Sequence, residues 1–247
     1  MIDTKFTGFI TVRTTSTRLP GKCLLPFGNE TVISHVVKRA ISYGIEPIIC
    51  TSTDSSDNVL EEIANELGVR CFRGSMNNKL KRWFDCAKKF NIESFHTIDA
   101  DDPFFDGFEM IKSLDLLQSG NYDVVCPTES SSSGGASVGY SLSRDIVVRA
   151  LYGLEDNTDT EMMWYYLERI KGIKMKTLPD HGTINSNVRL TLDYEEDYWL
   201  LASIIRILGN NASKKEVNQL FIDNPDLSKV NLFRNNEWKA AQLSKRI

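Results

Sequence analysis

The stretch that decides the fold is Phe6–Lys22, which reads FTGFITVRTTSTRLPGK. Its first part, Phe6–Val12, is a short run of apolar and β-branched residues, typical of a strand buried in a parallel sheet. Its second part, Arg13–Lys22, is polar and contains a proline and a glycine, so the strand must end there. We expect this cationic loop at the carboxyl end of the strand, where open α/β sheets bind their ligands.

Helical and strand-like patterns alternate after the cationic loop. Apolar residues recur at helical spacing over Thr31–Tyr43, and Pro47–Thr51 is the next strand-like run. The alternation predicts three more helices and three more strands: Asp57–Leu67, Lys79–Phe90 and Phe108–Gln118, and Val69–Phe72, Ser94–Ile98 and Tyr122–Cys126. Such a sequence indicates βαβ units and a Rossmann-like α/β fold, with a mostly parallel sheet covered by helices on both faces.

The pattern changes beyond Cys126. A Ser/Gly-rich stretch, Glu129–Ser137, is typical of a loop. After it we expect shorter elements: strands at Val138–Leu142, Lys174–Leu178 and Asn187–Leu192, and helices at Arg144–Leu151, Thr160–Ile170, Glu195–Leu208 and Lys214–Phe221. We interpret about 134–190 as an insertion, for acceptor binding or dimerisation, in a single domain that spans residues 1–247, and we expect a homodimer.

The composition excludes several classes of protein. With 247 residues, 41% hydrophobic and 25% charged, the chain fits one large α/β domain with a full core. A net charge of −4 argues against nucleic-acid binding, which usually needs a basic face. The five cysteines form no CxxC pair and are expected to be buried, reduced thiols. We see no signal peptide and no apolar run of about 18 residues, so we expect a cytoplasmic protein without membrane insertion.

The cationic loop has the chemistry that a triphosphate needs. It contains the three cations Arg13, Arg18 and Lys22, together with four hydroxyl side chains. Guanidinium and ammonium groups neutralise phosphate oxygens, and hydroxyls and backbone N–H groups fill the remaining acceptor sites. The same residues also fit a solvated basic loop, so composition alone leaves both interpretations open.

The segment ITVRTTSTRLPGKCLLP resembles the signature of the cytidylyltransferases that make CMP-activated acidic sugars. That family includes acylneuraminate and 3-deoxy-manno-octulosonate cytidylyltransferases and the spore-coat polysaccharide biosynthesis branch. The matching positions are Arg13, Ser16, Arg18, Leu19, Pro20, Gly21 and Lys22, while Val12 and Thr15 stand where alanine and glycine are usual. The resemblance implies a nucleotide-diphospho-sugar transferase fold, with Arg13 and Lys22 catalytic at the triphosphate and Val12, Ser16 and Arg18 binding the nucleotide.

The resemblance continues through most of the chain. Cys50–Leu60 resembles the family segment that lines the base pocket, which implies that Thr51, Ser52 and Asp54 bind the nucleotide. Arg82 lies in the helix after a family-like Phe-Arg-Gly-Ser segment and is placed in the same set. The stretch 134–190 matches much less well.

Three aspartates follow the predicted strand Ser94–Ile98. The resemblance implies that Asp101, together with Asp193 after the last predicted strand, binds Mg²⁺, which needs only one or two carboxylates. Other roles stay open: Asp101 as a loop cap before Pro103, and Asp193 as the N-cap of the following helix. Asp99 is a candidate further ligand or supporting residue.

These features predict a Mg²⁺-dependent transfer of CMP from CTP to a sugar or sugar-like acceptor, with release of pyrophosphate, for surface polysaccharide biosynthesis. The acceptor is open, because Asp159–Trp164 keeps Glu161 but lacks the arginine and histidine usual in the spore-coat branch. The side chains of Met162–Tyr166 either line a sugar pocket or pack in a core. The three histidines, His35, His96 and His181, are expected to be structural.

Two alternatives remain at this point. A nucleotide-sugar-dependent glycosyltransferase of related fold would use Asp99-Ala100-Asp101 as an Asp-x-Asp motif, although such an enzyme has no pyrophosphate for the cationic loop to bind. A non-catalytic nucleotide-binding homologue is the other, suggested by Thr15 and by the divergent 134–190 stretch.

Overall fold

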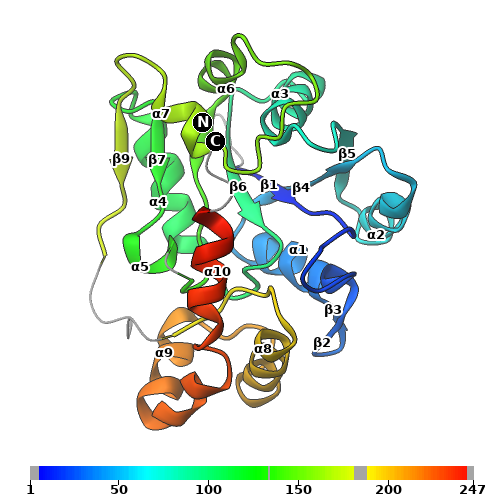
Figure 1. The fold of residues 1–247 in the computed structure, drawn as a ribbon, viewed down its shortest axis with the longest axis vertical. Helices are drawn as coiled ribbons and strands as arrows, with labels where there is room; N and C mark the ends of the chain where they lie inside the picture. The colour runs from blue at the N-terminus through cyan, green and yellow to red at the C-terminus, as the bar shows by residue number, and fades with distance from the viewer. Residues whose placement is uncertain (1–5, 133, 181–187, 244–247) are drawn as a thin grey trace.

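A computed structural model describes residues 6–132, 134–180 and 188–243. Within these ranges the chain forms one seven-stranded sheet and a separate two-stranded ribbon, surrounded by helices (Figure 1). The order of the large sheet is β5-β4-β1-β6-β8-β7-β9. Its strands are β1 (Thr7–Thr11), β4 (Glu46–Ser52), β5 (Arg70–Gly74), β6 (Ser94–Asp99), β7 (Val124–Cys126), β8 (Ser141–Ser143) and β9 (Met175–Thr177). The ribbon pairs β2 (Pro26–Phe27) with β3 (Glu30–Thr31).

The sheet is mostly parallel, as predicted. β5, β4, β1 and β6 are parallel neighbours, and β7 is parallel to β9. β8 runs antiparallel between β6 and β7. The stretch expected as an insertion thus contributes β8 and β9 to the central sheet, while its assignment to acceptor binding or dimerisation stays a prediction.

Helices cover both faces of the sheet, which confirms the predicted fold class (Figure 1). Many of them begin at a residue whose side chain accepts a hydrogen bond from the first turn, such as Thr31, Asn78 and Ser143. They are α1 (Val32–Ser42), α2 (Asn58–Glu66), α3 (Lys79–Lys89), α4 (Gly107–Gln118), α5 (Glu129–Ser132), α6 (Arg144–Leu151), α7 (Trp164–Glu168), α8 (Glu195–Leu208), α9 (Lys214–Asp223) and α10 (Arg234–Leu243), with 3₁₀ turns η1 (Lys22–Leu24), η2 (Ser55–Asp57) and η3 (Pro225–Val230).

Alternate residues of the central strands enter cores on opposite sides of the sheet. Phe9 packs in the core under α3 and α6, whereas Ile10 packs in the core with α1 and α2. The same division separates Ile48 from Ile49 on β4. Burial on both faces explains why these strands are apolar without alternation. A third cluster joins α8 and α9 to the ribbon through Phe27.

The predicted strand at the end of the stretch 134–190 is wrong for its described part, residues 188–192; Asn187 lies outside the described residues. This segment joins neither sheet, and its backbone bonds are made to loops. Leu190 N–H donates to Gly134 O, and Leu192 N–H donates to Asp101 O. It is apolar because it is buried, Val188, Leu190 and Leu192 packing in the third cluster.

Three further differences concern helices. The predicted helix Thr160–Ile170 is shorter, because α7 begins only at Trp164. The Ser/Gly-rich stretch begins with α5 instead of a loop, and Ser130 on it binds the Asp180 carboxylate. The helix α10 was not predicted, since its sequence RNNEWKAAQL has no regular apolar face.

The cysteines are free thiols; Cys23, Cys50 and Cys86 are buried as expected, and Cys71 and Cys126 are half-buried. No helix in the described ranges is long and apolar enough to cross a bilayer.

Two of the histidines are buried and bound to backbone oxygens. The His35 ring pairs with Pro103 O at 3.0 Å, and the His96 ring binds Ser141 Oγ at 2.8 Å and Val138 O. Burial lowers the pKa of each from 6.5 to about 4. Both are therefore neutral at neutral pH and serve packing, in line with the sequence prediction. His181 lies outside the described residues.

We expect the free energy of unfolding to fall on acidification. Between about pH 7 and about pH 5 the unfolded chain binds protons at both histidines and the folded chain does not, which costs roughly 2 kcal/mol per histidine. Urea unfolding at the two pH values measures this loss, and His35→Gln, which keeps a polar amide but cannot titrate, should reduce it by one histidine's share. An equal pH dependence in the variant and the wild type would contradict the assignment.

Candidate active site

The cationic loop follows β1 and is anchored to the end of β4 by Asp57. The Thr14 N–H and Oγ1 each donate to Asp57 Oδ1 at 2.8 Å, and Ser52 Oγ donates to Asp57 Oδ2 at 2.5 Å. Burial alone would raise the pKa of Asp57, but these hydrogen bonds hold it below its ordinary value. Sequence reasoning missed this role, because Asp57 only looked like the first residue of a helix.

The loop ends in a turn that requires glycine. Gly21 has φ +66°, in the left-handed region that other residues rarely adopt. Its N–H donates to Thr14 O at 3.0 Å, which closes the loop. The turn starts η1 at Lys22 and places this side chain inside the site.

Lys22 lies between two carboxylates from distant parts of the chain. Its Nζ donates to Asp101 Oδ2 and to Asp193 Oδ1, both at 2.9 Å, and to Leu192 O at 2.7 Å. Arg18 Nη2 donates to the same Asp193 oxygen at 2.6 Å. The structure thus brings together four of the predicted residues, two from the loop and the two candidate metal ligands.

Acidic charge is concentrated at this point. Burial, Asp193 and Asp99 raise the pKa of Asp101, although Lys22 acts in the opposite direction. Burial also disfavours charge on Asp193, but Lys22 and Arg18 hold its pKa below the ordinary value. Burial would lower the pKa of Lys22, and the two carboxylates keep it raised instead. Each buried charge here therefore depends on the opposite charges beside it.

A buried ion pair fixes the backbone of Asp193. Arg189 donates through Nε and Nη2 to both oxygens of Asp197, at 2.8 and 2.9 Å, and neither side chain is exposed. Asp197 Oδ2 in turn accepts the N–H groups of Asp193 and Tyr194 at 2.9 and 3.0 Å. Asp197 caps the start of α8, so the Asp193 carboxylate is left to face Lys22 and Arg18 instead of acting as N-cap.

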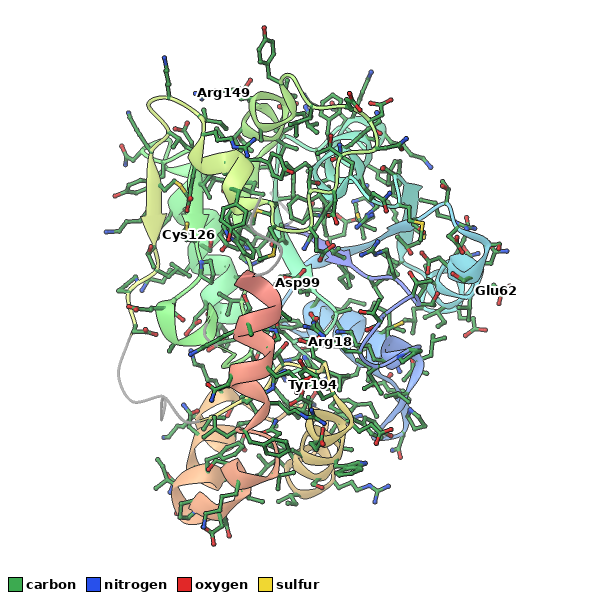
Figure 2. The ribbon with its side chains drawn as sticks, in the orientation of Figure 1. Arg18, Glu62, Asp99, Cys126, Arg149 and Tyr194 are labelled. Carbon is green, nitrogen blue, oxygen red and sulfur yellow. The ribbon has the colours of Figure 1, made fainter. Side chains whose placement is uncertain are left out.

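Two neighbouring cavities meet at these carboxylates. The smaller, about 390 Å³, is lined by the cationic loop, including Val12, Arg13 and Ser16. The larger, about 620 Å³, extends towards α7 and α10 and has the aromatic walls Tyr140, Trp164 and Trp238. Both cavities are lined by Arg18, Asp99, Asp101, Glu161 and Asp193. Figure 2 shows Asp99, Arg18 and Tyr194 gathered in the centre of the molecule beside α10.

Two predicted arginines contact the loop between β5 and α3. Arg13 donates to Met76 O at 2.9 Å and pairs with Glu161 at 3.3 Å. Arg82 is nearly fully buried and donates to Ser75 O at 2.6 Å, and burial lowers its pKa. Arg82 lines neither cavity and binds the backbone of the β5–α3 loop, whereas Arg13 lines the smaller cavity.

The residues predicted to line the base pocket, Thr51, Ser52 and Asp54, lie outside both cavities. Thr51 and Ser52 are fully buried, and Ser52 is bound to Asp57. The Asp54 carboxylate accepts from Ser56 N–H at 2.9 Å. None of the three lines either cavity, so their part in nucleotide binding stays a prediction.

Residues that the sequence did not single out complete the larger cavity. Lys79, the first residue of α3, pairs with Asp99 at 3.2 Å and approaches Glu161 at 3.9 Å. No local motif marks Lys79, because its partners lie 20 and 82 positions away.

Both interpretations of the Met162–Tyr166 run hold for part of it. Met162 and Trp164 line the larger cavity, whereas Met163 and Tyr166 pack in the core.

The chain is similar to known proteins along most of its length. The model of the cytidylyltransferase family matches residues 7–132, which hold β1, the cationic loop and Asp101. The chain belongs to the cytidylyltransferase family. As a cytidylyltransferase, it is a nucleotidyltransferase, as predicted.

Relatives of this cytidylyltransferase cover nearly its whole length. It is 26% identical to the spore coat polysaccharide biosynthesis protein SpsF of Bacillus subtilis, over 88% of this chain and 94% of the relative. The structure of a cytidylyltransferase from Leptospira borgpetersenii is similar, with a TM-score of 0.80 and 27% identity, covering 90% of this chain and 96% of that one. A CMP:2-keto-3-deoxy-manno-octonic acid synthetase, solved with CTP, shares the fold at 16% identity and TM-score 0.64, over 83% of this chain and 99% of that one.

The buried Arg189–Asp197 pair should dominate the stability of this region. Asp197→Asn removes a charge from a fully buried arginine, and breaking such a pair costs about 3–5 kcal/mol. The free energy of unfolding in urea measures the loss. The matched control is Asp226→Asn, which breaks the exposed pair with Lys229 and should leave stability unchanged within error. A similar small change in both variants would contradict the role of Asp197.

Proposed function

We propose that this nucleotidyltransferase transfers CMP from CTP to a sugar or sugar-like acceptor, with release of pyrophosphate, in surface polysaccharide biosynthesis. The observation that carries the proposal is Lys22, held between Asp101 and Asp193 where the two cavities meet. The smaller cavity has the cations that a triphosphate needs, and the larger has room and aromatic walls for an acceptor. The names of the relatives, SpsF and 3-deoxy-manno-octulosonate cytidylyltransferases, support this substrate class.

In this reaction an oxygen of the acceptor attacks the α-phosphorus of CTP. The new bond joins that oxygen to the α-phosphorus, and the bond from the α-phosphorus to the α,β-bridging oxygen breaks, so that pyrophosphate leaves. A hydroxyl acceptor gives its proton to solvent, whereas a phosphate acceptor attacks as the anion. Negative charge grows on the leaving group, and Arg13, Arg18 and Lys22 are positioned along the smaller cavity to stabilise it. Because Asp57 and Gly21 fix the loop, the backbone that carries these cations needs little reorganisation during the reaction.

The residues of the site also fit Mg²⁺. One oxygen of Asp101 and one of Asp193 lie 2.9 Å from the same Lys22 nitrogen, so both carboxylates already face one cation position. Mg²⁺ takes oxygen ligands, often one or two carboxylates with phosphate oxygens and waters. In the described residues no three or more acidic, histidine or cysteine side chains are grouped to hold a metal ion, so an ion here would rely on these two carboxylates together with phosphate oxygens and waters. When bound, the ion would neutralise charge on the reacting phosphate.

Family membership argues against the two alternatives raised by the sequence. A glycosyltransferase would use Asp99 and Asp101 together on one metal, but here they pair with different lysines, Lys79 and Lys22. Pyrophosphate release distinguishes a cytidylyltransferase, which produces pyrophosphate, from a glycosyltransferase, which does not.

A screen for pyrophosphate release should cross the four nucleoside triphosphates with keto-acid sugars, sugar phosphates and phosphonates, with and without Mg²⁺. We expect release with CTP, dependent on Mg²⁺ and stopped by EDTA; release without added divalent ions would contradict the metal proposal.

Lys22→Ala and Asp101→Ala should each reduce turnover by at least about 100-fold, the scale of losing a preorganised charge at a reacting phosphate. Pyrophosphate release measures turnover, and circular dichroism and the melting temperature check that the fold is intact. The control is Lys38→Ala, an exposed lysine on α1 that pairs with Glu30 outside both cavities. Unchanged turnover in either site variant would refute the site assignment.

A further inference from the structure

The helix α10 forms a wall of the larger cavity. It crosses the middle of the molecule beside the ends of the central strands (Figure 1). Its side chains Trp238 and Lys239 line the larger cavity together with Met162 and Trp164. In the smaller cavity α10 contributes Ala241, whose methyl side chain has no hydrogen-bonding group. The helix is thus placed to contact an acceptor and offers little to a nucleotide.

The position of α10 is fixed by the same buried pair that fixes Asp193. Asn231, just before the helix, donates to Asp197 Oδ1 at 2.9 Å, and Asn235 accepts from Arg189 at 3.0 Å. Arg234 binds both oxygens of Glu196 on α8, at 2.9 and 3.1 Å. The Trp238 ring itself lies 5.7 Å from the Arg189 guanidinium carbon. The cavity wall and the carboxylate at its base therefore share one rigid support.

Apart from Arg18, which the proposed function assigns to the triphosphate, the charges of the larger cavity leave one cation for an acceptor. Three cations line it, and two are neutralised by carboxylates: Arg18 by Asp193 and Lys79 by Asp99. Lys239 is exposed at the rim and forms no ion pair with any residue in the described part of the chain. An anionic group that enters this otherwise acidic cavity would be attracted most strongly to Lys239.

We propose that Trp238 and Lys239 are specificity-determining residues for the acceptor. The Trp238 ring packs against the apolar face of a sugar or polyol, and the Lys239 ammonium pairs with an anionic group on it, a carboxylate or a phosphate. This proposal rests on the proposed function, since it concerns the second substrate of that reaction. It assigns acceptor choice to the C-terminal helix in addition to residues from the 134–190 stretch.

The test compares Lys239→Gln, Trp238→Ala and Trp238→Phe with Lys229→Gln, which removes an exposed lysine that lines neither cavity. The acceptor probes are 3-deoxy-manno-octulosonate, for a carboxylate, and a sugar 1-phosphate, for a phosphate. We expect Lys239→Gln and Trp238→Ala to raise the KM of the accepted probe about 10-fold or more, the loss of one charge-assisted or stacking contact. The kcat should change much less, Trp238→Phe should restore most of the affinity, and Lys229→Gln should match the wild type.

Binding of a CTP analogue with a non-cleavable α,β bridge, measured by calorimetry, should be unchanged in all four variants. A purely structural role for Trp238 would weaken nucleotide and acceptor binding together, which overturns the proposal. An unchanged acceptor KM in Lys239→Gln, or a preference of the wild type for neutral or cationic acceptors, also overturns it.

If the wild type releases no pyrophosphate with any acceptor, it is the proposed function that fails. Calorimetric binding of the two probes to the wild type and to Lys239→Gln then decides the present proposal independently. Weaker binding in the variant supports it, and equal binding or no binding to the wild type refutes it.

Discussion

The site depends on one interaction, the Lys22 ammonium between the carboxylates of Asp101 and Asp193. These three groups come from β1's loop, the loop after β6 and the approach to α8, so the contact joins the sheet to the C-terminal third of the chain. An unpaired Asp193 carboxylate would be costly at its burial, and the Lys22 cation that it shares with the half-buried Asp101 offsets this cost. Both cavities are lined by the two carboxylates of this contact.

The parts behind this contact give it a fixed geometry. Asp57 fixes the cationic loop that carries Lys22, since its carboxylate binds both this loop and the end of β4. The Arg189–Asp197 pair fixes the segment that carries Asp193, and Asn231, just before α10, binds the same Asp197 carboxylate. Ionic groups that are fully buried and fully bonded have few alternative arrangements. This support keeps cations and carboxylates in place before any substrate arrives, which is what catalysis by charge stabilisation needs.

The sequence predicted most of the sheet, because continuous apolar runs mark its buried strands and helical periodicity marks the helices between them. It failed where the same pattern has another cause: residues 188–192 are apolar because loops and α8 enclose them, without any sheet pairing. It also missed α10, which is held by polar contacts of Asn231, Arg234 and Asn235 instead of an apolar face. The partners of Asp57 and Lys79 could not be predicted either, because they lie far away in the sequence.

The sequence by itself determined the donor side of the protein: an α/β sheet with a cationic, glycine-closed loop after its first strand, and the family that this loop indicates. These features are local, so nearby residues are enough to specify them. Only the tertiary structure decided which side chains meet in the site, because Lys22 lies 79 residues from Asp101 and 171 from Asp193 in the sequence. It also decided that α10 forms a wall of the acceptor cavity, since that placement depends on a buried ion pair far from the helix's own sequence.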